Sequence, residues 1–370
     1  MSILKEKIIE KIRKEGPVSF ETFMKMALYY PGLGYYMKDS TRIGKAGDFY
    51  TSPHLHPLFG AMLGRQMEEM WEVLLRPERF RIVEMGAGMG YLAGDLLDYL
   101  RDREIFRHID YSIVEMNPAM REQQRKLLEG SGADIRWFSD LKGVGEVTGC
   151  FLSNELLDAF PVRIVEQAEE LVEIRVDVQE DAFVEVPGPA DGECRAYFRE
   201  FAPRLPHGYR TEINLRIRDW LHDVSRCLRS GFLLTIDYGY TAEEYYSEDR
   251  SRGTLLCYYR HQISENPYRH IGEQDITAHV NFSSLKKWGE ELGFSTAGYC
   301  PQGTYLVALG IDEVLREKYG DAPDPFEIAK IKGLIFPQGM GESHQVMLQY
   351  RGAGVPSLRG FSLRNKAKNL

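Results

Sequence analysis

A glycine-rich turn near residue 86 constrains the fold more than any other stretch of the sequence. The apolar run Phe80–Met85 contains β-branched residues and leads into Gly86, Gly88 and Gly90, after which apolar residues recur at helical spacing as far as Leu100. This pattern predicts a strand, a tight turn and a helix. Glycine lets the backbone turn sharply and leaves room for a ligand, because it has no Cβ. We therefore predict an open α/β sheet with a ligand at this turn.

An acid before the turn indicates which ligand it binds. The G-x-G-x-G spacing also occurs in ordinary strand-to-helix turns and in the phosphate-binding turns of dinucleotide enzymes. Glu84 would place a carboxylate beside the ligand, which disfavours a pyrophosphate and suits a ligand that carries an amino group. S-adenosylmethionine (SAM) has an α-amino group and a sulfonium, and it has no phosphate. The sequence therefore favours SAM over a dinucleotide such as NAD.

Two further predicted strands are each followed by an acid. Residues 111–114 are followed by Glu115, about 25 residues beyond the turn, a spacing that suits a carboxylate accepting both ribose hydroxyls. NAD enzymes use the same arrangement, so Glu115 does not distinguish the two cofactors. Residues 134–138 are followed by Asp140, for which two roles are open. It could contact the adenine amino group, or it could cap a helix or turn.

The fourth predicted strand, residues 148–153, leads to the candidate acceptor site. It is followed by Asn154, Glu155 and Asp158. Ligands of open α/β sheets bind at the carboxyl ends of the strands, so these residues should meet the group that receives a methyl, with Asn154 also near the cofactor. Carboxylates bind a guanidinium in its plane, which leaves one terminal nitrogen free. Capping or turn roles are the alternative. His279 is a candidate acid, base or hydrogen-bonding group, although a lone histidine is commonly structural.

Residues 42–59 predict a lid over the cofactor. They are rich in Gly, Thr, Ser and Pro, miss the phosphate-loop spacing, and lead into a helix expected at about residues 57–75. Candidate substrate and lid residues are Asp48, Phe49, Thr51 and Ser52 in this loop and Tyr238 at the end of a later strand. His54 and His56 have no third ligand nearby, so we expect a surface pair or a pH-sensitive contact rather than a metal site.

Composition narrows the class of protein. At 370 residues the chain exceeds what one core usually fills, so we expect one large elaborated domain or two domains. A net charge of −9 argues against nucleic acid as the main partner and suits a basic protein or peptide. The 5 cysteines are scattered without a C-x-x-C pair, which indicates a reducing cytoplasm and no zinc site. No apolar run reaches membrane-spanning length, and the N-terminal residues resemble neither a signal peptide nor a transit peptide.

The rest of the sequence predicts insertions into the core. Period-two alternation between residues 162 and 186 predicts antiparallel strands of an inserted lobe. Later strands are expected near residues 293–299, 304–309, 334–342 and 345–350, and the basic end, residues 359–368, is expected to be frayed. The expected division is an N-terminal helical and lid region 1–75, core 76–161, inserted β-rich lobe 162–205, core 206–239, second insertion 240–281, core 282–355 and basic tail 356–370.

Five motifs together resemble a known family. They are Gly47–Pro53, Glu84–Gly88, Asn154–Ala159, Ile236–Gly239 and Asp275–Val280. In this order they are similar to the MidA family, over about residues 5–351. The mitochondrial member of that family is a respiratory complex I assembly factor that methylates an arginine of a complex I subunit. The resemblance implies a class I SAM-dependent methyltransferase with a Rossmann-like fold, symmetric dimethylation of a protein arginine, and a bacterial, cytoplasmic protein. It also implies a protein substrate such as a respiratory-complex subunit.

The acceptor is the point that the resemblance leaves open. Many members of the family have an acid and a small residue where this chain has His54 and His56, so its substrate can differ. Two other functions also fit the sequence: SAM-dependent methylation of a small molecule, and a SAM-binding assembly chaperone without turnover. The size of the two insertions favours a macromolecular substrate over a small one.

Overall fold

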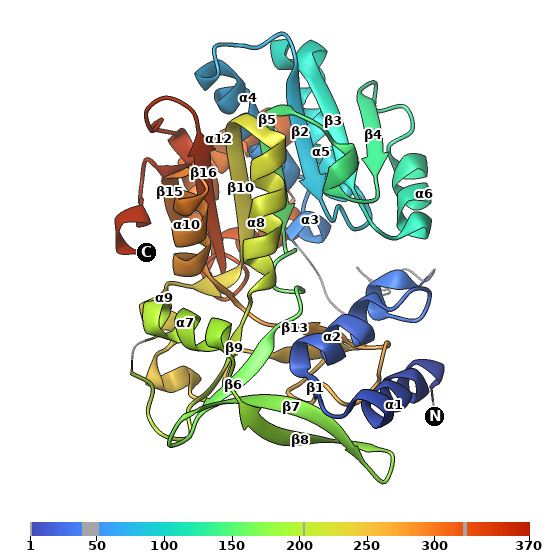
Figure 1. The fold of residues 1–370 in the computed structure, drawn as a ribbon. Helices are drawn as coiled ribbons and strands as arrows, with labels where there is room; N and C mark the ends of the chain where they lie inside the picture. The colour runs from blue at the N-terminus through green and yellow to red at the C-terminus, as the bar shows by residue number, and fades with distance from the viewer. Residues whose placement is uncertain (1, 39–51, 203, 321–323) are drawn as a thin grey trace. The chain divides into compact units, whose positions relative to one another are not determined.

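The computed structural model describes residues 2–38, 52–202, 204–320 and 324–370 (Figure 1). The chain forms two compact units. Unit 1 contains Met1–Phe49, Leu157–Asp219 and Tyr240–Leu285, and unit 2 contains Tyr50–Leu156, Trp220–Gly239 and Lys286–Leu370. Each unit is therefore assembled from segments that lie far apart in the sequence. In the described ranges, no helix has the length and apolar character needed to cross a membrane.

Unit 2 is built around a mostly parallel sheet with the strand order β15-β16-β10-β5-β2-β3-β4 (Figure 1). The strands are β2 (Phe80–Met85), β3 (Ile109–Val114), β4 (Asp134–Phe138), β5 (Val147–Asn154), β10 (Leu228–Tyr240), β15 (Ser295–Pro301) and β16 (His344–Arg351). The strands from β4 to β10 in this order run parallel, and β16 runs antiparallel to both of its neighbours. Every residue of β2 is buried, as expected for a parallel strand covered on both faces. The Rossmann-like α/β fold predicted from the sequence is confirmed.

The order of the strands determines where a ligand can bind. From β2 the chain continues outward to β3 and β4, and it then returns to β5 on the opposite side of β2. Ligands of open α/β sheets bind beside the carboxyl ends of the strands where the order reverses in this way. The glycine turn follows β2, and Glu155 follows β5. Both features predicted to carry function therefore lie at the reversal point of the sheet.

Two glycines let a pair of helices in unit 2 pack closely. The helices of this unit include α3 (Ser52–Leu55), α4 (Leu58–Val73), α5 (Tyr91–Leu100), α6 (Pro118–Leu127), α11 (Gln302–Ala308), α12 (Ile311–Tyr319) and α13 (Pro325–Ile335). A Cβ at Gly60 in α4 would lie 2.5 Å from the Cβ of Asp95 in α5. A Cβ at Gly64 would lie 2.7 Å from the Cδ1 of Tyr99. The close contact buries the apolar faces of α4 and α5 in one core with the strands of the sheet.

Unit 1 contains an antiparallel sheet covered by two amphipathic helices. The sheet has the order β1-β7-β6-β9, with β8 paired to β7, which confirms the antiparallel strands predicted between residues 162 and 186. The elements are α1 (Ile3–Glu15), β1 (Val18–Ser19), α2 (Phe20–Tyr29), β6 (Arg163–Gln167), β7 (Leu171–Gln179), β8 (Ala182–Pro189) and β9 (Arg210–Ile213). Ser2 and Ser19 cap the two helices through their hydroxyls. The apolar stripes of α1 and α2 pack against β6 and β7.

Shorter elements complete the described chain. Strands β11 (Leu256–Tyr259), β12 (Gln262–Ser264) and β13 (Asp275–Thr277) form a small antiparallel sheet in unit 1. The other elements include α7 (Gly192–Phe201), α8 (Arg216–Cys227), α9 (Ala242–Tyr245), β14 (Val280–Asn281) and α10 (Phe282–Glu291).

Two stretches predicted as strands are not strands. Residues 304–309 fall in and just after helix α11, and residues 334–342 begin in the last turn of α13 and continue as turns. In α11, Tyr305 and Leu306 are buried while Val307 is 47% exposed, which is a helical rather than an alternating pattern. A short apolar run fits a buried helix as well as a strand, because neither period is resolved over so few residues.

The basic end of the chain is packed rather than frayed. The ring of Phe361 is 5% exposed and lies against β15, where a Cβ at Gly298 would be 2.2 Å from it. The N–H of Lys366 donates to the carbonyl of Tyr299 at 2.7 Å. Arg359 pairs with Glu313 of α12 at 2.7 Å. The prediction of a frayed tail was wrong because a buried aromatic residue and these polar contacts attach the tail to unit 2.

Candidate functional site

The glycine turn after β2 has the backbone conformation that its spacing predicts. Gly86, Gly88 and Gly90 have φ angles of +67°, +52° and +88°, in the left-handed region that favours glycine. The N–H of Gly86 donates to the carbonyl of Val114 at 2.9 Å, which ties the turn to the end of β3. Helix α5 begins directly after Gly90. The turn therefore presents backbone and no side chain at Gly86 and Gly88, as a closely approaching ligand requires.

Gln124 of α6 supports this turn and was missed by sequence reasoning. Its side chain is fully buried, its Nε2 donates to the carbonyl of Gly88 at 2.8 Å, and its Oε1 accepts from the indole of Trp137 at 3.1 Å. One glutamine thus joins the turn to strand β4. A polar residue in a highly charged helix normally faces solvent, so the sequence carried no signal for this role.

Glu84 is a buried carboxyl with a raised pKa. It is 3% exposed, and its Oε2 accepts from the hydroxyl of Tyr111 at 2.7 Å. Burial raises the pKa of Glu84 to about 7, against the opposing effect of the Tyr111 hydrogen bond, and the negative charge of Glu115 raises it further. At neutral pH, Glu84 therefore carries only part of a negative charge. A cationic group placed beside it would favour the ionised form.

The affinity for SAM is expected to rise with pH between pH 6 and 8. The predicted contact with the α-amino group needs ionised Glu84, so binding below pH 7 must remove a proton from this carboxyl. Calorimetry in buffers of different ionisation enthalpy should show proton release at pH 6.5 that disappears at pH 8. Glu84→Gln should bind SAM more weakly and without this proton release. If the parent protein shows no proton release, Glu84 does not contact the amino group.

The same carboxyl is expected to make the ligand-free protein less stable as the pH rises. Its folded-state pKa of about 7 lies above the ordinary value of 4.5, so the folded protein holds more protons than the unfolded chain between these values. The contribution of Glu84 to stability is complete below pH 4.5 and is lost as the pH passes through 7.

Two other predicted cofactor residues differ in their surroundings. Glu115, directly after β3, is half-buried, and its Oε1 accepts the N–H of Asn117 at 2.8 Å. Burial raises the pKa of Glu115, and this N–H opposes the increase. Asp140, after β4, is exposed and accepts the N–H of Lys142 at 2.9 Å as the cap of a short helical turn. Asp140 thus takes the capping role that the sequence left open, and its contact with adenine stays a prediction.

Glu155 is held by one carboxylate oxygen at the end of β5. Its Oε1 accepts the N–H of Ser52 at 3.1 Å and the Nδ2 of Asn154 at 3.2 Å, and it lies 3.6 Å from the Nε2 of His344. Within the described residues, its Oε2 has no hydrogen bond. The side chain is 6% exposed, and the backbone has a φ of +49°, an unfavourable conformation for a residue with a Cβ. Strained residues of this kind are commonly found at functional sites.

The next strand, β10, and its partner β16 complete the surroundings of Glu155. Asp237 is fully buried and accepts the N–H groups of Leu156 at 3.1 Å and Tyr238 at 2.9 Å. The ring of Tyr238, a predicted substrate residue, packs against the buried ring of His344, and the two ring centroids are 3.9 Å apart. His344 follows Glu155 by almost 200 positions and pairs with Tyr238 only through the register of β10 and β16, so the sequence did not reveal it.

The two histidines near the end of the predicted lid loop occupy separate sites. His54 is half-buried, and its ring lies edge-on to Tyr91 with the centroids 5.1 Å apart. Burial lowers the pKa of His54, and the negative charge of Glu155 opposes this. His56 is buried, and its Nε2 lies 2.8 Å from the Oε2 of Glu327. The surface pair was therefore wrong, whereas the other alternative, a pH-sensitive contact, stays a prediction. Of the predicted lid residues, Ser52 contacts Glu155, whereas Asp48, Phe49 and Thr51 lie outside the described residues.

In unit 1, the chain around Asp158 is fixed by three successive carbonyl groups. The carbonyl of Leu157 accepts from the Nδ2 of Asn214 at 3.1 Å, that of Asp158 accepts the N–H of Ala278 at 2.9 Å, and that of Ala159 accepts from the hydroxyl of Tyr29 at 2.9 Å. The contact with Ala278 brings Asp158 next to the segment that carries His279. The two predicted residues of unit 1 thus belong to one hydrogen-bonded assembly.

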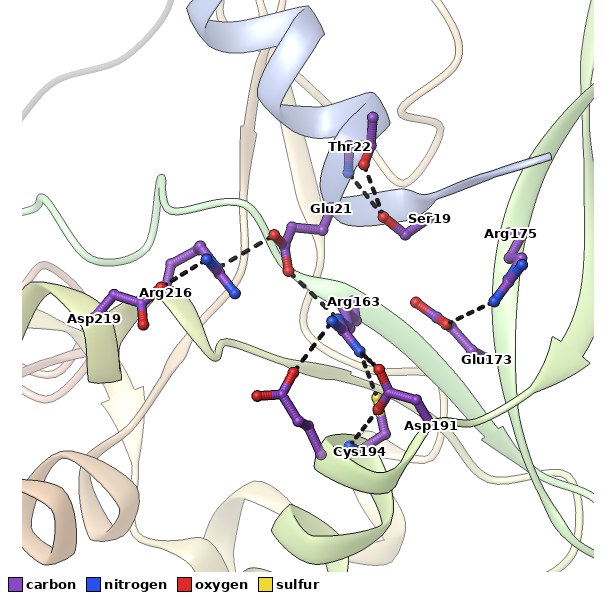
Figure 2. Close-up of polar contacts among 11 residues, drawn as sticks. Ser19, Glu21, Thr22, Arg163, Glu173, Arg175, Asp191, Cys194, Arg216 and Asp219 are labelled. Atoms are coloured by element: carbon purple, nitrogen blue, oxygen red, sulfur yellow. Dashed lines mark hydrogen bonds and ion pairs between the residues drawn. The ribbon is translucent and has the colours of Figure 1, made fainter. Parts of the chain in front are cut away.

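A network of charged side chains centred on Arg163 holds the same region of unit 1 (Figure 2). Arg163, at the start of β6, is 16% exposed and contacts the carboxylates of Glu21, Asp191 and Glu193 and the thiol of Cys194. Glu21 of α2 also pairs with Arg216 at 3.2 Å. Burial would raise the pKa of Asp191, but the N–H of Cys194 and the Arg163 guanidinium hold it at about 2. The network joins α2, which carries Tyr29, to the strand that follows Asp158.

Arg163→Leu is expected to destabilise the protein. The substitution leaves Glu21, Asp191 and Glu193 without their common cation. Arg163 and Glu21 are 16% and 18% exposed, whereas Asp191 and Glu193 are 45% and 66% exposed, so the expected loss is on the order of 1–3 kcal/mol. Thermal and urea unfolding should show this loss. Arg226→Leu is the matched control, because Arg226 is 78% exposed and, among the described residues, pairs only with Asp223 of its own helix; it should change stability by less than about 0.5 kcal/mol. Equal stability of both variants would contradict the role of Arg163.

The fold and the turn together define the class of this protein. The protein has the features of a class I SAM-dependent methyltransferase. These are a Rossmann-like sheet, a glycine turn at the point where the strand order reverses, and a buried acid before that turn. The sequence family described as S-adenosyl-L-methionine-dependent methyltransferase (Methyltransf_28) matches residues 62–300, and this chain belongs to it.

Solved structures and curated relatives extend the similarity over nearly the whole chain. A Burkholderia thailandensis protein crystallised with S-adenosyl-homocysteine is 32% identical, with 99% of this chain and 96% of that chain covered and a TM-score of 0.91. A native crystal structure from the same organism is 33% identical with a TM-score of 0.89 and the same coverage. The protein arginine methyltransferase NDUFAF7, mitochondrial, of Bos taurus is 28% identical over 86% of this chain and 76% of its own length. That of Rattus norvegicus is 27% identical over 97% and 87%.

SAM is the cofactor, and the residues of unit 2 suit it. The left-handed glycines leave open backbone where a ligand can approach, and Glu84 provides a carboxyl for an amino group. The buried Oδ1 of Asn154 has no hydrogen-bond partner in the described part of the chain and is available to a ligand. We therefore expect Glu84, Glu115, Asn154 and the glycine turn to hold SAM.

Proposed function

We propose that this methyltransferase transfers the methyl group of SAM to a terminal nitrogen of an arginine side chain in a protein. The observation that carries the proposal is the Oε2 of Glu155, which accepts no hydrogen bond from the residues that the structure describes. Because Oε1 is held by Ser52 and Asn154, the carboxylate is fixed and presents its other oxygen to an incoming donor. A planar guanidinium supplies such donors together with the opposite charge. The names of the relatives from Bos taurus and Rattus norvegicus, protein arginine methyltransferases, support the same acceptor.

In the proposed mechanism, Glu155 orients the acceptor and stabilises its charge. When bound, SAM would supply a methyl group carried on a sulfonium sulfur; the N–C bond to the acceptor would form as the C–S bond breaks, with S-adenosyl-homocysteine as the leaving group. Glu155 accepts an N–H of the guanidinium, which fixes its plane and leaves another nitrogen free to react. The nitrogen that gains the methyl loses one proton to water, so the guanidinium keeps a single positive charge. Asp158 and His279, both in unit 1, keep the acceptor-binding roles that the sequence predicts for them.

The test uses SAM with a deuterated methyl group. The purified protein is incubated with this SAM and with protein extract from a deletion strain, and peptides are analysed by mass spectrometry. We expect labelled arginine, symmetrically dimethylated, in a small set of proteins that includes a respiratory-complex subunit. Label found only in small molecules would contradict a protein acceptor. SAM binding without any transfer of label would instead indicate an assembly chaperone.

A further inference from the structure

A buried carboxylate in unit 1, Glu212 of β9, has no role in the mechanism described above. It is 3% exposed and accepts hydrogen bonds from the N–H of Thr254 at 2.9 Å, the hydroxyl of Thr254 at 3.1 Å, the N–H of Leu255 at 3.3 Å and the hydroxyl of Tyr245 at 3.4 Å. No cation of the described residues forms an ion pair with it. Burial raises the pKa of Glu212, and ionising it among neutral partners is costly, so its hydrogen bonds are the feature to explain.

The direction of one hydrogen bond shows what Glu212 holds. The backbone N–H of His279 can only donate, and it lies 3.0 Å from the Oγ1 of Thr254. The hydroxyl of Thr254 therefore accepts from His279 and has its own hydrogen to give to Glu212 at 3.1 Å, the shorter of its two other contacts; the hydroxyl of Tyr245 lies 3.3 Å from the same Oγ1. This makes a continuous path from His279 through Thr254 to the buried carboxylate.

The loop around Thr254 is shaped to enclose Glu212. Gly253 has a φ of +84°, and a Cβ at this position would lie 2.1 Å from the Oε1 of Glu212, so only glycine fits. The carboxylate thus sets the path of residues 253–255, and through Thr254 it sets the position of His279. The preceding N–H, that of Ala278, is bound to the carbonyl of Asp158 at 2.9 Å. Two consecutive N–H groups therefore fix His279 relative to Asp158.

We propose that Glu212 and Thr254 are positioning residues, which hold His279 beside Asp158 in the arrangement needed to bind the acceptor. This inference rests on the function proposed above, because it assigns a purpose to the placement of two residues that contact the acceptor in that mechanism. Neither Glu212 nor Thr254 is assigned a contact with substrate.

Thr254→Val and Thr254→Ser separate positioning from general stability. Valine keeps the shape of threonine but cannot accept from His279, whereas serine keeps the hydroxyl. We expect Thr254→Val to lower kcat/KM for the protein acceptor by at least about 10-fold while SAM affinity stays within about twofold. Thr254→Ser should stay within about threefold of the parent. Parental kcat/KM in Thr254→Val would overturn the proposal.

A double-mutant cycle with His279→Ala tests whether the effect passes through His279. If Thr254 acts by positioning His279, Thr254→Val should cost less than about twofold once the imidazole is absent. The full loss in the His279→Ala background would show that Thr254 acts only through stability, and it would overturn the proposal.

Amide hydrogen exchange distinguishes failure of this inference from failure of the proposed function. The amides of Ala278 and His279 should exchange faster in Thr254→Val than in Thr254→Ser, with no change in the strands of unit 2. Unchanged exchange would overturn the positioning role whatever the substrate is. If no methylated arginine is found but exchange responds as expected, the proposed function fails and the positioning of His279 is supported.

Discussion

Replacing Gly86 with valine is expected to abolish measurable SAM binding. Gly86 has a φ of +67°, which a β-branched residue adopts only with strain, and a Cβ there would lie 2.9 Å from the Cδ1 of Leu156. The methyl groups of valine would also extend into the space that the turn leaves for the ligand. Strain and steric exclusion together should weaken binding by roughly 3 kcal/mol or more, which is over 100-fold. Calorimetry with SAM measures this directly.

A second left-handed glycine provides the control for backbone strain. Gly132, between α6 and β4, has a φ of +79°, and a Cβ there would make only ordinary contact with Phe106 at 3.8 Å. Gly132→Val introduces similar strain away from the turn and should bind SAM like the parent. If Gly86→Val also binds SAM like the parent, the ligand does not lie at the glycine turn. Loss of binding in both variants would attribute the effect to folding.

Replacing Glu155 with glutamine is expected to lower methyl transfer about 100-fold or more, without a comparable loss of SAM binding. The glutamine oxygen can keep the hydrogen bonds from Ser52 and Asn154, so the shape of the site is preserved. Its NH₂ group replaces Oε2 and presents donors to a guanidinium that also has only donors. The substitution therefore removes the charge and the acceptor that orient the arginine. Initial rates with a methylated-peptide readout, together with SAM titration, measure both quantities.

An exposed acid just before β16 provides the matched control. Glu342 is exposed and precedes His344 by two positions, so Glu342→Gln changes the net charge equally and should leave the rate within about twofold. A parental rate in Glu155→Gln would exclude Glu155 as the acceptor residue. Equal losses of SAM affinity and of rate would place Glu155 in the cofactor site instead.

Much of the core of unit 2 could be predicted from local patterns. The strand, turn and helix at residues 80–100 followed from the apolar run, the glycines and the helical spacing. The acids that follow strands, Glu115 and Glu155, could be placed at the ligand edge of the sheet because parallel strands share one direction. These predictions depend on hydrogen bonds and burial within a few neighbouring residues. The amino-acid sequence therefore determined the class of fold, the cofactor and the position of the candidate site.

Contacts between distant segments decided what local patterns left open. The short apolar run at residues 304–309 became a helix, and Phe361 attached the tail, because of packing that no local period encodes. Gln124 at the glycine turn and His344 beside Glu155 are brought to the site by packing and strand register. A single buried polar residue is specified by partners that can lie anywhere in the chain, so only the tertiary structure decided which side chains hold the turn, Glu155 and His279.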